Sequence, residues 1–346
     1  MSARRKSQAV RSARWSRMSD EELLQLRLCD LQLSLRGSLV ARYLAQLQNE
    51  LKRRGIRFKP HVWLADEWFS PDGVPGIAIP FYMAHPRLMR LERKMMGEVE
   101  GGNASWAMRI IRHEAGHAFD NAFRVRRRKD WRRTFGKASR RYPDVYRVRP
   151  SSRHFVLHLG HWYGQSHPTE DFAETFAVWL QPRARWRREY DDWPALKKLE
   201  YVDGLVQQIK GEPPLVTEQH IVAPLEDNRR TLAEHYRRKQ ARYAIAGAQA
   251  YDRRIKRVFG TRDGKRRMRA STFLRQVRPQ LTRLLTRRSR LHPYLVHQVF
   301  RALLHRCREL DLVVTRSQRV SKRAALGLLE RILIDVLRRD RERYAL

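Results

Sequence analysis

The sequence predicts an α+β fold that is mostly helical, with a small sheet beside one central helix and a basic helical region towards the C-terminal end. Apolar residues recur at three- and four-residue spacing through most of the chain, which is typical of amphipathic helices. Two short stretches, 57–68 and 76–81, are instead rich in β-branched and aromatic residues. The turn sequence Ser70–Gly73 lies between them, so we expect two short strands there.

Composition divides the chain into three expected parts. The first 18 residues are rich in Arg and Ser and contain neither an acidic residue nor an apolar run, so we expect a disordered basic tail at 1–18 and no secretory signal. A folded domain is expected at 19–212, because Gly211–Pro214 forms a clear linker pattern. The basic helical C-terminal region is expected at 213–346. Its helices should cover Leu232–Ala250, Ser271–Arg288, Tyr294–Leu310 and Ser321–Arg339.

The composition limits the class of protein. The 346 residues are 42% hydrophobic, enough for one large core or two modest ones. Two cysteines far apart exclude a disulfide framework and favour a reducing, cytoplasmic location. No apolar run approaches the roughly 18 residues that a membrane span needs. We therefore expect a cytoplasmic protein with no membrane span.

The net charge is +37, from 73 Lys and Arg against 36 Asp and Glu. Such a charge favours anionic partners, such as nucleic acid or an acidic membrane surface. Because the charge looks spread along the chain, a general bias toward Arg is the simpler explanation. Nucleic acid bound through the basic surface is the alternative.

Polar side chains mark the expected helix starts. Ser19 is followed three residues later by Glu22, which is the capping-box pattern. Ser38 precedes a second stretch with helical periodicity, and Gly55 is placed to end that helix. Asn103 is placed to cap the central helix.

The two expected strands precede the central helix. A small sheet there could form one wall of a cleft, and a peptide could pair along its edge. Pro80 limits the second strand to an edge or an end, because proline donates no backbone hydrogen bond.

The central helix carries the pattern His-Glu-x-x-His at His113, Glu114 and His117. Residues four apart share a helix face, so the two imidazoles point at a common position. Two neutral imidazoles suit Zn²⁺, and Glu114 lies beside the position that a catalytic zinc keeps open. The alternative is a helix whose two histidines are simply buried and hydrogen-bonded. Small Gly116 lets another element approach this helix.

A catalytic zinc needs a third protein ligand. An acidic helix start 53 residues after His117 offers candidates, with Pro168 or Thr169 beginning that helix. Glu170 and Glu174 share a face, so if one binds the metal, the other can accept the N–H of a ligating histidine. Spacing does not choose between the candidate third ligands, which are Glu170, Asp171, Glu174, His161 and His167.

Three motifs together carry a resemblance. They are HEAGH from His113 to His117, the pair Tyr163–Gly164, and PTEDFAETFAVWL from Pro168 to Leu180. With them the sequence resembles the bacterial zinc-binding metallopeptidase family, which is related to the catalytic domain of anthrax lethal factor. The resemblance runs from about Ser19 to Tyr243. The long basic C-terminal region and the lack of a cysteine-rich zinc ribbon depart from the family pattern.

The resemblance implies a zincin-like domain of the gluzincin type and a role for each matching residue. It implies that Glu170 binds zinc together with His113 and His117. It also implies that Glu174 holds a zinc-binding residue in position without binding the metal itself, and that Tyr163 stabilises the transition state. Without the resemblance, Tyr163 would be interpreted as an aromatic residue of the core.

The expected activity is that of a zinc-dependent metallopeptidase acting on a peptide or protein substrate. Zinc-activated water would attack the peptide bond, with Glu114 as general base. The alternative is a nucleic-acid-associated basic protein with a structural zinc site and no proteolysis. A protease fold that has lost activity is a third reading, which the intact ligand and base set disfavours. Glu114 discriminates between the first two, because a structural site needs no carboxylate beside an open metal position.

Overall fold

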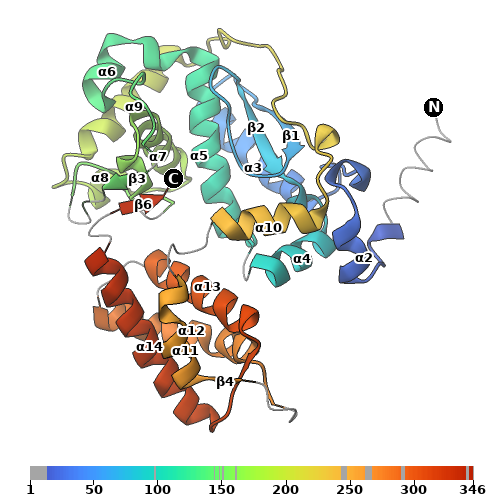
Figure 1. Cartoon of the computed structure of the whole chain (residues 1–346). Helices are drawn as coiled ribbons and strands as arrows, with labels where there is room; N and C mark the ends of the chain where they lie inside the picture. Colours follow the sequence, from blue (N-terminus) through green and yellow to red (C-terminus); the bar gives the residue numbers. More distant parts are fainter. Residues whose placement is uncertain are drawn as a thin grey trace. The chain divides into compact units, whose positions relative to one another are not determined.

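The computed structural model describes residues 14–96, 99–143, 145–147, 149, 152–159, 162–242, 248–261, 267–289, 293–339 and 343–345. Helices dominate the described part, with three two-stranded sheets, so the expected mostly helical α+β class is confirmed. The chain divides into two compact units, Met1–His235 with Arg343–Leu346, and Tyr236–Glu342 (Figure 1).

The boundary between the two units lies later in the sequence than the linker pattern at 211–214 indicated. Segment 213–235 packs on the first unit, where the backbone N–H of Leu215 donates to Ala122 O at 2.9 Å. The N–H of Leu232 likewise donates to Leu26 O at 2.9 Å. The chain after the Gly211–Pro214 linker pattern is therefore an ordered segment of the first unit, because its backbone groups find partners there.

Part of the expected N-terminal tail is folded. Trp15 is buried, and its indole Nε1–H donates to Leu31 O at 3.1 Å. The expected tail therefore ends earlier than Met18, while residues 1–13 lie outside the described part of the chain.

Helix α5 (Ala104–Phe123) runs through the first unit, between the pair β1–β2 and helix α7 (Pro168–Leu180) (Figure 1). The expected caps are confirmed: the Ser19–Glu22 capping box begins α2, and the side chains of Ser38 and Asn103 accept the first backbone N–H groups of α3 and α5. The other helices of this unit are α2 (Asp20–Gln25), α3 (Leu39–Arg53), α4 (Pro86–Met96), α6 (Lys129–Phe135), α8 (Trp186–Glu189) and α9 (Leu196–Ile209), and α10 (Leu232–Arg242) spans the division.

Strands β1 (His61–Ala65) and β2 (Gly76–Pro80) pair in parallel, and Pro80 ends β2 as expected. Ala78 pairs with Trp63 on one side, and its N–H donates to Phe69 O at 2.8 Å on the other. Since β2 is buried and paired on both edges at this point, Ala78 of β2 cannot pair with a peptide. A further pair joins β3 (Val145–Arg147) to β6 (Arg343–Ala345), antiparallel.

An aromatic cluster joins α5 to α7. Phe119 of α5 stacks on Phe176 of α7 with ring centroids 4.8 Å apart, and Phe172 and Trp179 extend the cluster. All four are fully buried. Pairs of this kind add about 0.5–1.5 kcal/mol beyond area burial. The two helices are therefore held in a fixed register.

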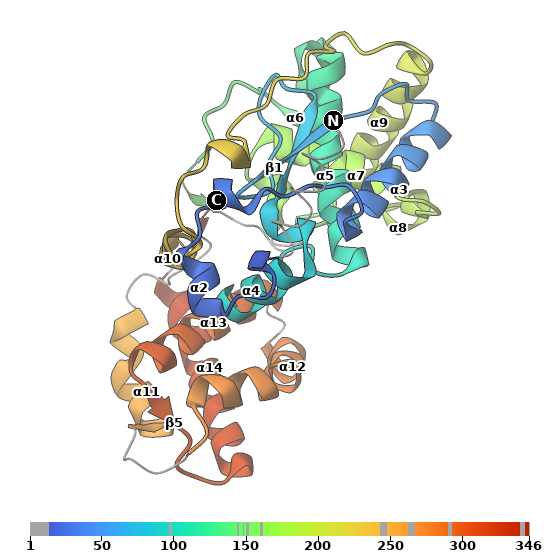
Figure 2. The same ribbon diagram turned by 90° about the vertical axis from the view of Figure 1, so that its right-hand side faces the viewer.

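The second unit is helical, with one short ribbon of two strands. Its elements are α11 (Asp252–Val258), β4 (Gly260–Thr261), α12 (Ala270–Ser289), α13 (Pro293–Glu309), β5 (Leu312–Val313) and α14 (Gln318–Arg339) (Figure 2). The helices expected at 271–288, 294–310 and 321–339 are present with boundaries shifted by at most three residues. The helix expected at Leu232–Ala250 instead ends at Arg242, and residues 243–247 lie outside the described part of the chain. In the described part of both units, no helix combines the length and the apolar character needed to cross a bilayer.

Candidate metal centre

Helices α5 and α7 approach closely because Gly116 has no side chain. A Cβ at Gly116 would lie 2.9 Å from the Cα of Ala173 and 3.1 Å from its carbonyl oxygen. Real Cβ atoms do not approach a backbone so closely, so α7 can lie against the face of α5 that carries both histidines only beside a glycine.

Three ligand atoms from these helices converge. His113 Nε2 lies 3.0 Å from Glu170 Oε2, His117 Nε2 lies 3.1 Å from the same oxygen, and the two nitrogens are 3.2 Å apart. All three residues are buried, and they form a group whose ligand atoms could hold a metal ion. Tetrahedral ligands at the usual Zn–N and Zn–O lengths lie roughly 3.3 Å from one another. The triangle therefore fits one small divalent cation.

The protonation of His113 supports this fit. Its Nδ1 contacts Glu174 Oε1 at 3.1 Å, so Nδ1–H donates and Nε2 faces the centre, where its lone pair would bind a cation if the Nε2 proton were released. Burial alone would lower the pKa of His113, but hydrogen bonds to Glu170 and Glu174 raise it to about 10. A proton on Nε2 thus occupies the position that a cation would take.

Glu174 is held firmly behind His113. Its carboxylate accepts the backbone N–H groups of His158 at 3.3 Å and Leu159 at 3.1 Å. His158 is itself buried, its pKa is lowered to about 4 by burial, and its neutral ring donates to Arg109 O at 2.9 Å. Glu174 therefore supports a candidate ligand without contributing a ligand atom.

Glu114 lies one residue after the first histidine and has a different environment. Its side chain is buried, yet its carboxylate makes no hydrogen bond or ion pair with any residue that the structure describes. Its backbone carbonyl accepts the hydroxyl of Ser70 at 3.1 Å, so the turn between the strands packs on the helix at this point. The carboxylate remains available to a small molecule beside the cluster.

Tyr163 lies beside His113. Its ring centroid is 5.6 Å from that of His113, and the preceding Trp162 has φ +52°. Burial raises the pKa of Tyr163 well above its usual value, and the negative charges of Glu170 and Glu114 raise it further. The phenol therefore keeps its proton at neutral pH and can donate it in a hydrogen bond.

Tyr142 was missed by sequence reasoning. Its hydroxyl donates to Glu170 Oε1 at 2.8 Å, and it also contacts the hydroxyl of Thr169. Its ring stacks on His167 with centroids 3.8 Å apart. The second oxygen of Glu170 is thus held by Tyr142 while Oε2 faces the histidines. Tyr142 lies in an irregular segment and belongs to no motif, so this contact had no signal in the sequence.

The remaining candidates for a third ligand are placed elsewhere. His167 caps α7, and its ring contacts Arg140 O at 2.7 Å. Asp171 pairs with Lys198 at 2.6 Å. His161 lies outside the described residues. Among the described candidates, Glu170 alone directs an oxygen to both histidines.

Comparison with family models, with curated proteins and with solved structures finds no match to this chain. The class of site therefore rests on its own geometry: a buried group of two imidazoles and one carboxylate that could hold a metal ion. The resemblance to zinc-binding metallopeptidases remains a prediction from the motif residues.

Proposed function

We propose that this protein is a zinc-dependent metallopeptidase that hydrolyses peptide bonds in a protein or peptide substrate. The observation that carries the proposal is the triangle of His113 Nε2, His117 Nε2 and Glu170 Oε2 beside the unpartnered carboxylate of Glu114. Three protein ligands with a nearby general base are the set that catalytic zinc sites use.

A bound Zn²⁺ would act as a Lewis acid and bring the pKa of a coordinated water to about 7. Glu114 would take the proton from the attacking water and pass it to the leaving amine. Tyr163, protonated at neutral pH, would donate a hydrogen bond to the oxygen that becomes negative. Removal of one such donor typically lowers the rate by about 100- to 1,000-fold.

The competing proposal is a nucleic-acid-associated protein with a structural zinc and no proteolysis. Structural zinc sites are closed by four protein ligands. Here the described residues offer three ligand atoms, and Glu114 is buried beside them without a partner. This arrangement favours the catalytic proposal, since a structural zinc site needs no carboxylate beside an open metal position.

The test is cleavage of a fluorogenic peptide library by the wild type, Glu114→Gln and the control Glu200→Gln, an exposed residue of α9. Glu114→Gln should lower the rate by at least about 100-fold and leave the zinc content unchanged, because it removes the base alone. Glu200→Gln should match the wild type. Full activity of Glu114→Gln would overturn the proposed mechanism.

A further inference from the structure

The positive charge is concentrated in the second unit. Residues 236–342 contain 30 Lys and Arg against 8 Asp and Glu, out of 73 and 36 in the whole chain. The remaining 239 residues thus carry 43 against 28. The expectation that charge is spread along the chain is therefore wrong, and a general bias toward Arg does not explain why this unit has fewer acidic residues for its length than the rest of the chain.

Two long stretches of this unit contain no acidic residue at all. The first lies between Asp263 and Glu309, and the second between Asp311 and Glu330. They form helix α12, most of α13 and the first half of α14. Helices α12 and α14 contact each other, and Lys322 donates to Gln280 Oε1 across that contact.

Exposed arginines surround the contact between Lys322 and Gln280. Arg283 lies one turn after Gln280 on α12, and Arg319 and Arg323 lie four residues apart on α14, so each pair shares a helix face. All three arginines are exposed. We call this surface the α12–α14 basic face, defined by Arg283, Arg319, Lys322 and Arg323.

Two carboxylates of this unit are paired with arginines outside this face. Asp252 of α11 pairs with Arg306, and Asp335, near the end of α14, pairs with Arg254 at 2.5 Å. Arg319 and Arg323 make no ion pair with any described residue.

We infer that the α12–α14 basic face binds the phosphodiester backbone of nucleic acid. Of the 30 basic residues in 236–342, 26 are Arg, whose planar fork matches phosphate oxygens in a bidentate way. Two helices in contact present these groups side by side, which suits the repeated phosphates of a duplex.

An anionic membrane is the competing partner. Three aliphatic residues, Leu284, Val320 and Ile334, are exposed on α12 and α14. Among the described residues of these two helices, however, no aromatic side chain is exposed. Membrane-surface helices combine a broad apolar face with Trp, Phe or Leu anchors, so the charge pattern favours nucleic acid.

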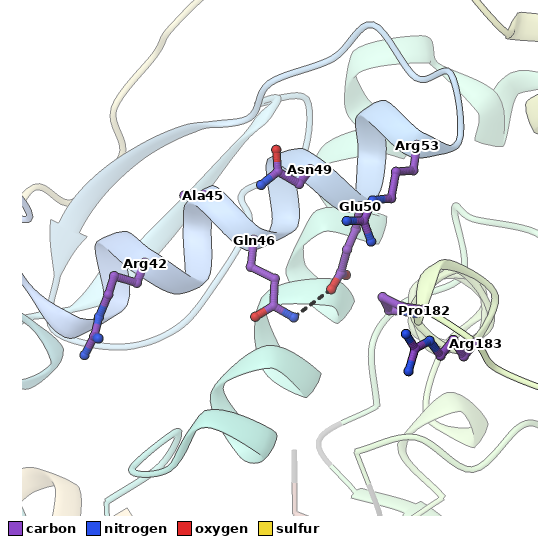
Figure 3. Close-up of a pocket in the computed structure, with 8 residues that line it drawn as sticks. All are labelled: Arg42, Ala45, Gln46, Asn49, Glu50, Arg53, Pro182 and Arg183. Atoms are coloured by element: carbon purple, nitrogen blue, oxygen red, sulfur yellow. Dashed lines mark hydrogen bonds between the residues drawn. The ribbon is translucent and has the colours of Figure 1, made fainter.

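The first unit provides a matched control surface. A hollow of about 650 Å³ lies between α3 and the segment after α7 (Figure 3). Arg42, Arg53 and Arg183 line it and make no ion pair with described residues. Its one acidic residue, Glu50, is already bound to Arg112 at 2.7 Å and to Gln46 at 2.9 Å. This hollow therefore offers three arginines without ion pairs in the other unit, with which the α12–α14 basic face can be compared.

The experiment measures fluorescence anisotropy of a labelled 20-base-pair duplex with the full chain between 50 and 200 mM salt. It compares the wild type, the face variant Arg283→Gln/Arg319→Gln/Arg323→Gln, and the control variant Arg42→Gln/Arg53→Gln/Arg183→Gln. Both variants remove three charges. The face variant should weaken binding by about tenfold or more and reduce the slope of log K against log salt by about 2–3. The control variant should stay within about twofold of the wild type.

Three results would overturn the inference: an equal loss in both variants, a loss in the control variant alone, or binding to phosphatidylserine vesicles without binding to the duplex. Circular dichroism of each variant shows whether a loss of binding reflects misfolding. If the Arg→Gln variant misfolds, an Arg→Lys variant at the same three positions is measured in its place. Lysine keeps the charge, so it should restore most of the salt slope if the face binds phosphates. The inference does not depend on the proposed peptidase activity, because duplex binding should persist in Glu114→Gln.

Discussion

Each oxygen of the Glu170 carboxylate has a different neighbour. Oε2 faces His113 and His117, while Oε1 accepts the hydroxyl of Tyr142. With Oε1 engaged, the carboxylate can offer one oxygen to a metal. Tyr142 and Glu174 thus support the candidate ligands from two directions, and both act by positioning.

Removal of the Tyr142 hydroxyl should loosen Glu170. Tyr142→Phe is expected to lower zinc affinity by about tenfold, the lower end of the range for such supporting contacts, because Tyr142 is 42% exposed. Competition with a chromophoric chelator measures this. Tyr201→Phe is the control. It removes a hydroxyl that lies away from the cluster and donates to Asp130 Oδ1 at 3.3 Å, so it should leave zinc affinity unchanged. Equal effects of the two variants would remove Tyr142 from this role.

The pKa of His113 predicts how pH acts on the metal-free protein. Since its folded pKa of about 10 exceeds the usual 6.5, the protonated ring stabilises the fold fully below about pH 6.5. That stabilisation is lost as pH rises toward 10. The urea midpoint in EDTA should fall between pH 6.5 and 9, while the zinc-loaded protein should keep its midpoint, because zinc replaces the proton. A midpoint in EDTA that is constant or rises over this range would contradict the role of His113.

At the scale of elements, the contact between α5 and α7 sets the geometry of the site. Gly116 permits the close approach, and stacked Phe119 and Phe176 fix the register. The sequence predicted both helices, the N-cap of α5 and the start of α7, because these depend on local patterns. The sequence could not decide which of Glu170, Asp171 and Glu174 is the third ligand. All three lie in the first turns of α7, and only the packing of that helix determines which side chain faces both histidines of α5.

Gly116→Ala tests this contact. The helix propensity of Ala would add up to about 1 kcal/mol, but the new Cβ meets backbone atoms of Ala173, so a net loss of about 1–3 kcal/mol is expected. Urea unfolding measures it, and zinc affinity should fall as well. Gly204→Ala, at an exposed position of α9, is the matched control, because its Cβ would meet nothing within 4 Å. It should stabilise the folded protein by about 0.5–1 kcal/mol. Stabilisation by both changes would show that α5 and α7 can separate without cost.

At the scale of the whole molecule, the chain combines a candidate metal centre in one unit with a strongly basic helical unit. The position of the division was predicted too early, because the Gly- and Pro-rich segment is ordered by backbone partners such as Ala122 O. The uneven charge was present in the sequence and needed only a count for each unit. The contact of Tyr142 with Glu170 was not predictable, since it joins an irregular segment to a helix 28 residues later.

The central claim is that His113, His117 and Glu170 hold one divalent ion. Its most direct test is the zinc stoichiometry of the purified full chain, measured by mass spectrometry of the metal for the wild type and Glu170→Gln. The account predicts one zinc per chain in the wild type and far less in the variant, because one of three ligands is weakened. A wild type that does not bind zinc, or a variant that keeps a full equivalent, would contradict it.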